Sequence, residues 1–260
     1  MKNKEIILSK VFNDITNIIL DFVYPDNITC IICDKPINKN NTYSMCRECF
    51  INLNFILDGC IKCGKPIINH SLEKQDISGC SSCFNKGFYF DKAIACIEYD
   101  DLSKKLILDF KYRNKTFISK YIARIIKEKL EIENLKFDYI LYVPLHKNRF
   151  KKRGFNQSEK IATKLSNIIY VPSINIIERK KNTRKLYKLN KEERKKELKN
   201  VFIINDNKDI LKNKKVLLID DIFTTGSTVN EISKVLKLNG VDKVFVMTLL
   251  TRSSDTYAVE

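Results

Sequence analysis

The chain has 260 residues, of which 44% are hydrophobic and 30% are charged. This composition excludes an intrinsically disordered protein and predicts a soluble globular one, with room for a small module beside one ordinary domain. The formal net charge is +16, and residues 147–199 alone hold eighteen Lys and Arg against five Glu. Such a basic segment favours a phosphate-rich partner, although a Lys-rich surface that only aids solubility would give the same charge.

The first 24 residues predict an amphipathic helix packed on the body of the protein. Apolar residues recur there at helical spacing, and Asp14 and Asp21 interrupt them. The sequence has no continuous apolar run of the length that export or membrane spanning requires. We therefore expect a cytoplasmic protein, with a peripheral membrane contact of this helix as the weaker alternative.

Eight of the nine cysteines form four Cys-x-x-Cys pairs, at Cys30/Cys33, Cys46/Cys49, Cys60/Cys63 and Cys80/Cys83. This spacing lets two thiolates face one ion from a tight turn, and the intervals between pairs are typical of zinc ribbons. Three other interpretations of the pairs are less favoured. Disulfides would need an oxidising compartment, and a redox motif normally has one Cys-x-x-Cys pair and not four. The cysteines of iron–sulfur proteins are spaced differently. The sequence thus predicts two structural zinc sites. Sequential pairing has the shortest loops, and a crossed pairing (first with third, second with fourth) stays open.

Beyond the cysteine pairs, strand-like and helix-like segments alternate. Strands are expected at residues 93–99, 138–143, 201–204, 215–219 and 243–250. Helices are expected at residues 100–112, 116–130, 157–169 and 227–238. Strands separated by helices imply right-handed crossovers and an α/β fold with a mostly parallel sheet. Cys96 falls in an apolar run and is expected to be a buried strand residue.

The most informative stretch follows the strand predicted at residues 215–219. Asp220 and Asp221 come at its carboxyl end, where ligands bind in open α/β sheets. A hydroxyl-rich loop then opens a helix, so that free amides and the helix dipole would face a phosphate; its residues are Thr224, Thr225, Gly226, Ser227 and Thr228. The acids would repel a phosphate, but they suit sugar hydroxyls or a bridging magnesium ion. Phosphate and diol together indicate a ribose 5-phosphate.

This stretch looks like the phosphoribosyl pyrophosphate signature of type I phosphoribosyltransferases. The chain as a whole resembles the ComF family of competence-associated proteins, through the paired cysteines, the signature and the run Arg153-Gly154-Phe155-Asn156-Gln157. The resemblance implies a pyrophosphate-binding turn after Val143-Pro144, a mobile basic cover over about residues 179–199, and Asp220 and Asp221 on the ribose. It also implies an association with the uptake or handling of single-stranded DNA.

The basic residues that follow the expected turn suit pyrophosphate, with bidentate Arg contacts favoured; they are Arg149, Lys151, Lys152 and Arg153. We therefore expect a helix over residues 1–24, a double zinc ribbon over residues 25–88 and a phosphoribosyltransferase-like domain over residues 89–260.

Two functions fit these expectations. The first is an enzyme that transfers 5-phosphoribose from phosphoribosyl pyrophosphate, with Asp220 and Asp221 as the catalytic pair and magnesium beside the departing pyrophosphate. The second is a non-catalytic protein that handles single-stranded DNA or senses the same ligand. The motifs identify neither an acceptor nor a general base, so they leave turnover open.

Overall fold

The computed structural model describes residues 28–38, 40–67, 80, 83, 87–113, 115–181, 193, 197–198, 200–205 and 208–252. The helix predicted over residues 1–24 lies outside these ranges, as does most of the predicted basic cover. Within the described part of the chain, no helix combines the length and apolarity needed to cross a membrane.

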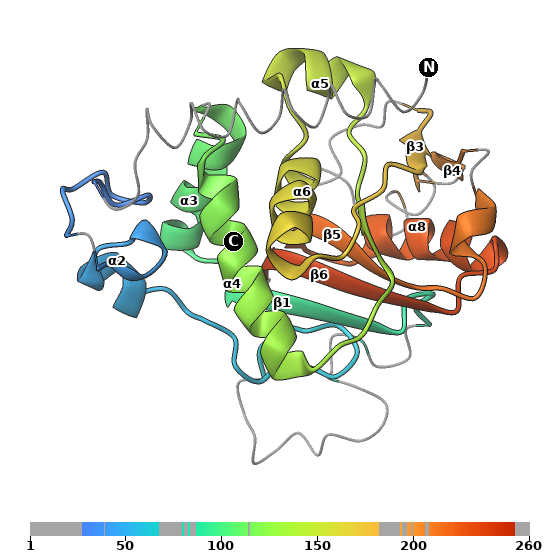
Figure 1. Cartoon of the computed structure of the whole chain (residues 1–260), viewed down its shortest axis with the longest axis horizontal. Coiled ribbons are helices and arrows are strands. Elements are labelled where there is room, and N and C mark those ends of the chain that lie inside the picture. Colours follow the sequence, from blue (N-terminus) through green and yellow to red (C-terminus); the bar gives the residue numbers. More distant parts are fainter. Residues whose placement is uncertain are drawn as a thin grey trace.

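A parallel sheet of four strands forms the centre of the molecule (Figure 1). Its order is β1 (Lys92–Glu98), β6 (Lys243–Thr251), β5 (Lys215–Phe223) and β2 (Tyr139–Tyr142), with parallel pairing throughout. The strands are nearly continuous aliphatic runs, because a parallel sheet is covered on both faces. The predicted fold class is confirmed.

Helices pack on both faces of this sheet. Successive strand residues point to opposite faces. Leu217 and Ile219 of β5 accordingly share a core with α3 (Asp101–Tyr112), α4 (Ile118–Glu133) and α6 (Gln157–Ile169). Val216 and Leu218 share the other core with α8 (Ser227–Leu238). Cys96 is buried in β1, as predicted.

Several short elements were not predicted from the sequence. α5 (Lys147–Arg153) buries none of its residues, so no apolar periodicity marked it. β3 (Ile177–Arg179) was not predicted either; it pairs in antiparallel fashion with β4 (Phe202–Ile204), the strand expected at residues 201–204, in a separate two-stranded sheet. The cysteine-rich part contains η1 (Thr42–Ser44) and α2 (Arg47–Ile51), and η3 (Lys208–Leu211) precedes β5.

The cysteine-rich segment is joined to the sheet through β1. Residues 54–56 run antiparallel to this strand: the Glu98 amide donates to the Asn54 carbonyl and the Ile56 amide to the Cys96 carbonyl, at 2.8 and 2.9 Å. Farther along, the Ala93 amide donates to the Lys62 carbonyl at 2.8 Å. These contacts cover the edge strand, which would otherwise expose unpaired backbone groups.

Candidate functional site

The two acids lie inside β5 and not after it. We expected the strand to end at Ile219, but its pairing with β6 continues as far as Phe223. Asp221 Oδ2 is 2.6 Å from Lys111 Nζ of α3, and both side chains are largely shielded from solvent. Asp220 Oδ1 accepts hydrogen bonds from the Asp221 amide at 2.9 Å and from the Ser158 hydroxyl at 3.3 Å. Each acid is therefore held by a different element.

The environment of Asp220 changes its titration. Burial raises the pKa of this carboxyl to about 7, and the charge of Asp221 adds to the rise. The Asp221 amide, Lys111 and the Ser158 hydroxyl act in the opposite direction. Near neutral pH the carboxyl is present in both protonation states, so it can donate or accept a hydrogen bond to a hydroxyl-bearing ligand.

The loop after β5 has the geometry of an anion-binding turn. Gly226 has φ 74° and precedes the first residue of α8. A Cβ at this position would lie 2.6 Å from the Phe223 ring, so no other residue fits without strain. The hydroxyl oxygens of Thr225 and Ser227 lie 2.7 Å apart at the amino end of the helix. Amides and hydroxyls thus gather where the helix dipole favours negative charge.

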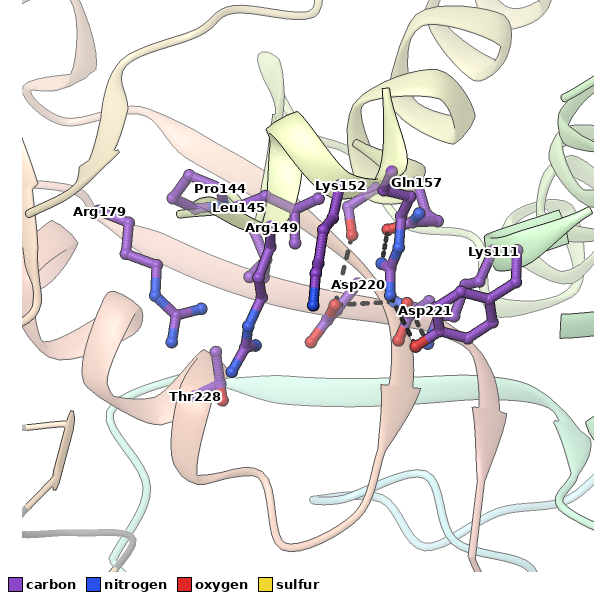
Figure 2. Close-up of a pocket in the computed structure, with 14 residues that line it drawn as sticks. Lys111, Pro144, Leu145, Arg149, Lys152, Gln157, Arg179, Asp220, Asp221 and Thr228 are labelled. Atoms are coloured by element: carbon purple, nitrogen blue, oxygen red, sulfur yellow. Dashed lines mark hydrogen bonds and ion pairs between the residues drawn. The ribbon is translucent and has the colours of Figure 1, made fainter. Parts of the chain in front are cut away.

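A cavity of about 720 Å³ connects this loop with the acid pair (Figure 2). Its described lining carries five cationic side chains against two acids, which favours a polyanionic ligand. Arg149, Arg179 and Thr228 lie toward one end of the cavity, and Lys111 and Gln157 toward the other. The residues that line it are Lys111, Tyr112, Val143, Pro144, Leu145, Arg149, Lys152, Arg153, Gln157, Ser158, Arg179, Asp220, Asp221 and Thr228.

Three of the four predicted pyrophosphate residues line this cavity: Arg149, Lys152 and Arg153. Their spacing places them on one face of α5. Lys151 is exposed and does not line the cavity. Of the five predicted loop residues, Thr228 lines the cavity, Thr224, Thr225 and Gly226 form the turn that leads into α8, and Ser227 is the first residue of that helix.

The Arg153 guanidinium is fixed by two neighbours. It donates to Gln157 Oε1 at 2.5 Å and to the Tyr112 hydroxyl at 3.0 Å, and it stacks over the Tyr112 ring at 4.8 Å from the centroid. Arg179 of β3 is more deeply placed. Burial, with the nearby charge of Arg149, lowers the pKa of Arg179 to about 10, so it remains charged near neutral pH.

The comparisons with known proteins agree with this geometry. Residues 140–260 match the phosphoribosyl transferase domain, and residues 19–84 match the double zinc ribbon domain. Competence protein F of Haemophilus influenzae is 30% identical over 228 residues, which cover 85% of this chain and 95% of that protein. The chain belongs to the ComF family.

Other ComF relatives are more distant. The DNA utilization protein YhgH of Escherichia coli K12 is 26% identical over 228 residues, covering 85% of this chain and 95% of that protein. Competence protein ComFC of Streptococcus pneumoniae is 29% identical over 156 residues, covering 60% of this chain and 66% of that protein. The resemblance inferred from the sequence is thereby confirmed.

The eight paired cysteines of this ComF protein form two clusters with sequential pairing. Within each cluster the ligand sulfurs lie within 4.8 Å of one another. The shortest separations are 3.5 Å for Cys60 and Cys83 and 3.7 Å for Cys33 and Cys46. A tetrahedron with Zn–S bonds of about 2.3 Å has an edge of about 3.8 Å, so the clusters fit zinc and are too open for disulfides. The complete sets are Cys30, Cys33, Cys46, Cys49 and Cys60, Cys63, Cys80, Cys83.

Sequence reasoning assigned no role to four residues that shape the ComF cavity: Lys111, Tyr112, Gln157 and Ser158. The first two end α3, far along the chain from the acids; the run Phe110-Lys111-Tyr112 belongs to the family resemblance, but it suggested no role for them. Gln157 and Ser158 begin α6 directly after the basic run, and this position at a predicted helix start was the available signal.

Proposed function

We propose that this ComF-family protein binds phosphoribosyl pyrophosphate with magnesium and acts as a phosphoribosyltransferase-like protein associated with DNA uptake. The observation that supports this most is the convergence of three parts in one cavity. The acids of β5, the amino end of α8 and the cations of α5 are separated in the chain, yet they line the same space.

Each part suits one portion of the ligand. The 5-phosphate fits the turn at Gly226, where amides and hydroxyls gather. The ribose hydroxyls fit Asp220 and Asp221, and the pyrophosphate fits Arg149 and its neighbours on α5. The carboxylates offer the oxygen ligands that magnesium prefers, and the ion would neutralise the departing pyrophosphate. In an enzyme, the acids would also stabilise the positive charge that develops at the anomeric carbon.

A second candidate is a non-catalytic protein that handles single-stranded DNA. The helix α5 supports this candidate, because it buries no residue and carries five cations around Phe150, which is 45% exposed. Aromatic and cationic side chains together suit a single strand. The names of the relatives, a competence protein and a DNA utilization protein, agree with this setting. We also propose a cytoplasmic location, where the thiols stay reduced for zinc.

Calorimetric titration of the zinc-loaded protein with phosphoribosyl pyrophosphate and magnesium tests the proposal. Saturable binding is expected for the wild type, with loss in the Asp220→Asn/Asp221→Asn and Arg149→Ala variants. Lys151→Ala is the matched control on α5, because its side chain lies outside the cavity. Absence of binding to a folded wild type would refute the proposal. Binding to single-stranded DNA that weakens steeply with salt would then support the second candidate.

A further inference from the structure

Lys111 reaches the acid pair from outside the signature. Its Nζ is 2.6 Å from Asp221 Oδ2, and the exposed fractions of the two side chains are 14% and 17%. Ion pairs shielded in this way hold their partners in place more strongly than exposed ones do. The orientation of Asp221 therefore depends on the position of the last turn of α3.

That turn is tied to the first zinc ribbon by a bridging lysine. Lys115 Nζ is 3.1 Å from Asp109 Oδ2, in the same turn of α3 as Lys111, and 2.6 Å from Asp34 Oδ1. Asp109 is buried, with a side chain only 4% exposed. Asp34 directly follows Cys33, and its amide donates to the Cys30 carbonyl at 3.0 Å, which closes the first metal-binding turn.

Apolar packing reinforces this connection. Cys30 and Cys49 of the first cluster lie in the same hydrophobic core as Leu106 and Phe110 of α3. The second cluster lies in the other core, with β5 and α8. A change in the first ribbon would thus be transmitted to α3, because close-packed interiors transmit strain.

We propose that Lys111 is a positioning residue that holds Asp221 in the cavity, and that the first zinc ribbon sets its place through Lys115. The inference rests on the proposed binding of phosphoribosyl pyrophosphate at this site. Zinc in the first cluster and the ligand are then energetically linked, so each strengthens the binding of the other by the same factor.

The pKa of Asp220 provides a readout that would not change if Lys111 only stabilised the fold. Its Oδ1 accepts a hydrogen bond from the Ser158 hydroxyl of α6, and the charges of Asp221 on the same strand, Lys111 of α3 and Arg179 of β3 act on it. Lys111 is one of the groups that lower the pKa of Asp220. A variant that removes the charge of Lys111, or moves it away from Asp220, should therefore raise the pKa of Asp220.

The experiment compares Lys111→Met, Lys111→Arg and Lys115→Met with the wild type in the full zinc-loaded chain. Lys127→Met is the matched control, because it removes an exposed lysine of α4 whose partner is Glu131, at 2.9 Å. Calorimetry should show affinity for phosphoribosyl pyrophosphate lowered by about 10- to 100-fold in Lys111→Met, the effect of losing one charge-assisted contact. Lys111→Arg should recover part of it. Lys115→Met should lower the affinity by about 5-fold or more, within the usual range of coupling between sites, but by no more than Lys111→Met, because Lys115 acts through Lys111.

Two readouts need no ligand, so they judge the inference even if the proposed function fails. In carbon-13 spectra of aspartate-labelled protein, the Asp220 carboxyl should titrate at a higher pH in Lys111→Met and Lys115→Met than in the wild type. Its titration in Lys127→Met should match that of the wild type. A chelator should remove one of the two zinc ions faster from Lys115→Met than from the wild type. A wild-type Asp220 titration in Lys111→Met would overturn the role of Lys111. If Lys111→Met raised the Asp220 titration but Lys115→Met changed neither the titration nor the rate of zinc removal, the link to the first zinc ribbon would be refuted.

Discussion

Gly226 permits a direct test of why the phosphate-type loop needs glycine. Alanine at this position has two costs. The left-handed backbone, at φ 74°, costs a residue with a Cβ about 1–2 kcal/mol. The added Cβ would also lie 2.6 Å from the Phe223 ring. Overpacking of this kind costs about 1–3 kcal/mol, so Gly226→Ala should lower the free energy of unfolding by about 2–5 kcal/mol.

Gly240 provides the matched control at the other end of α8. Its backbone is also left-handed, at φ 85°, but the nearest atom to an added Cβ is the flexible Lys212 Cγ at 3.4 Å. Gly240→Ala should therefore cost only the backbone strain of about 1–2 kcal/mol.

Urea denaturation of both variants gives the two free energies, and an unchanged m value confirms that compactness is preserved. Equal losses in Gly226→Ala and Gly240→Ala would refute the argument from the Phe223 contact. A larger loss in Gly226→Ala than in Gly240→Ala, reduced to the backbone strain alone when Gly226→Ala is measured in a Phe223→Leu background, would support it, because the smaller side chain makes room for the methyl group.

Three further outcomes are expected. Chelation should release two zinc ions per chain and lower the unfolding temperature, as atomic absorption and circular dichroism would show, because both clusters are part of the hydrophobic cores. Glu133→Ala should lower the free energy of unfolding by about 3–5 kcal/mol. The Glu133 carboxylate pairs with Lys92 Nζ at 2.6 Å and with Lys129 Nζ at 3.1 Å, and both lysines would lose this partner. Burial alone would raise the pKa of Glu133, but the two lysines lower it, so urea denaturation should show this loss shrinking in acid. Asp220→Asn should gain stability relative to the wild type as pH rises from about 4 to about 7, because folding raises the pKa of Asp220 and favours its protonated form. A stability difference that does not change with pH would contradict the last expectation.

Helices with clear local signals were predicted closely. α6 and α8 begin and end at the predicted residues, because Asn156 caps the first and Asn239-Gly240 ends the second. Spacing predicted the two zinc sites, since two thiolates in one turn need few other contacts, but it left the pairing open, and the structure shows the sequential pairing. The end of β5 was missed because acids usually mark the end of a buried strand, whereas here Lys111 and Ser158 provide tertiary partners for them.

The residues of the candidate site also differ in whether a local sequence pattern indicated them. The resemblance implied a pyrophosphate-binding turn after Val143-Pro144, and the signature indicated a phosphate loop after β5. Because β2 and β5 pair in parallel, the connections that follow them leave from the same edge of the sheet. Lys111 instead comes from the end of α3, and no local pattern specifies where that helix packs. Arg179 begins the basic cover that the resemblance implies, but the strand that carries it was not predicted.

Lys111, for which the sequence indicated no role, changes the charge of the site. The signature alone indicates two adjacent free carboxylates, which would repel both each other and a pyrophosphate. In the folded protein Asp221 is paired with Lys111, and burial brings the pKa of Asp220 to about 7. Much of the negative charge implied by the motif is therefore neutralised before a ligand arrives. The proposed ligand binding should therefore depend on pH through Lys111 of α3 as well as through the acids of the signature.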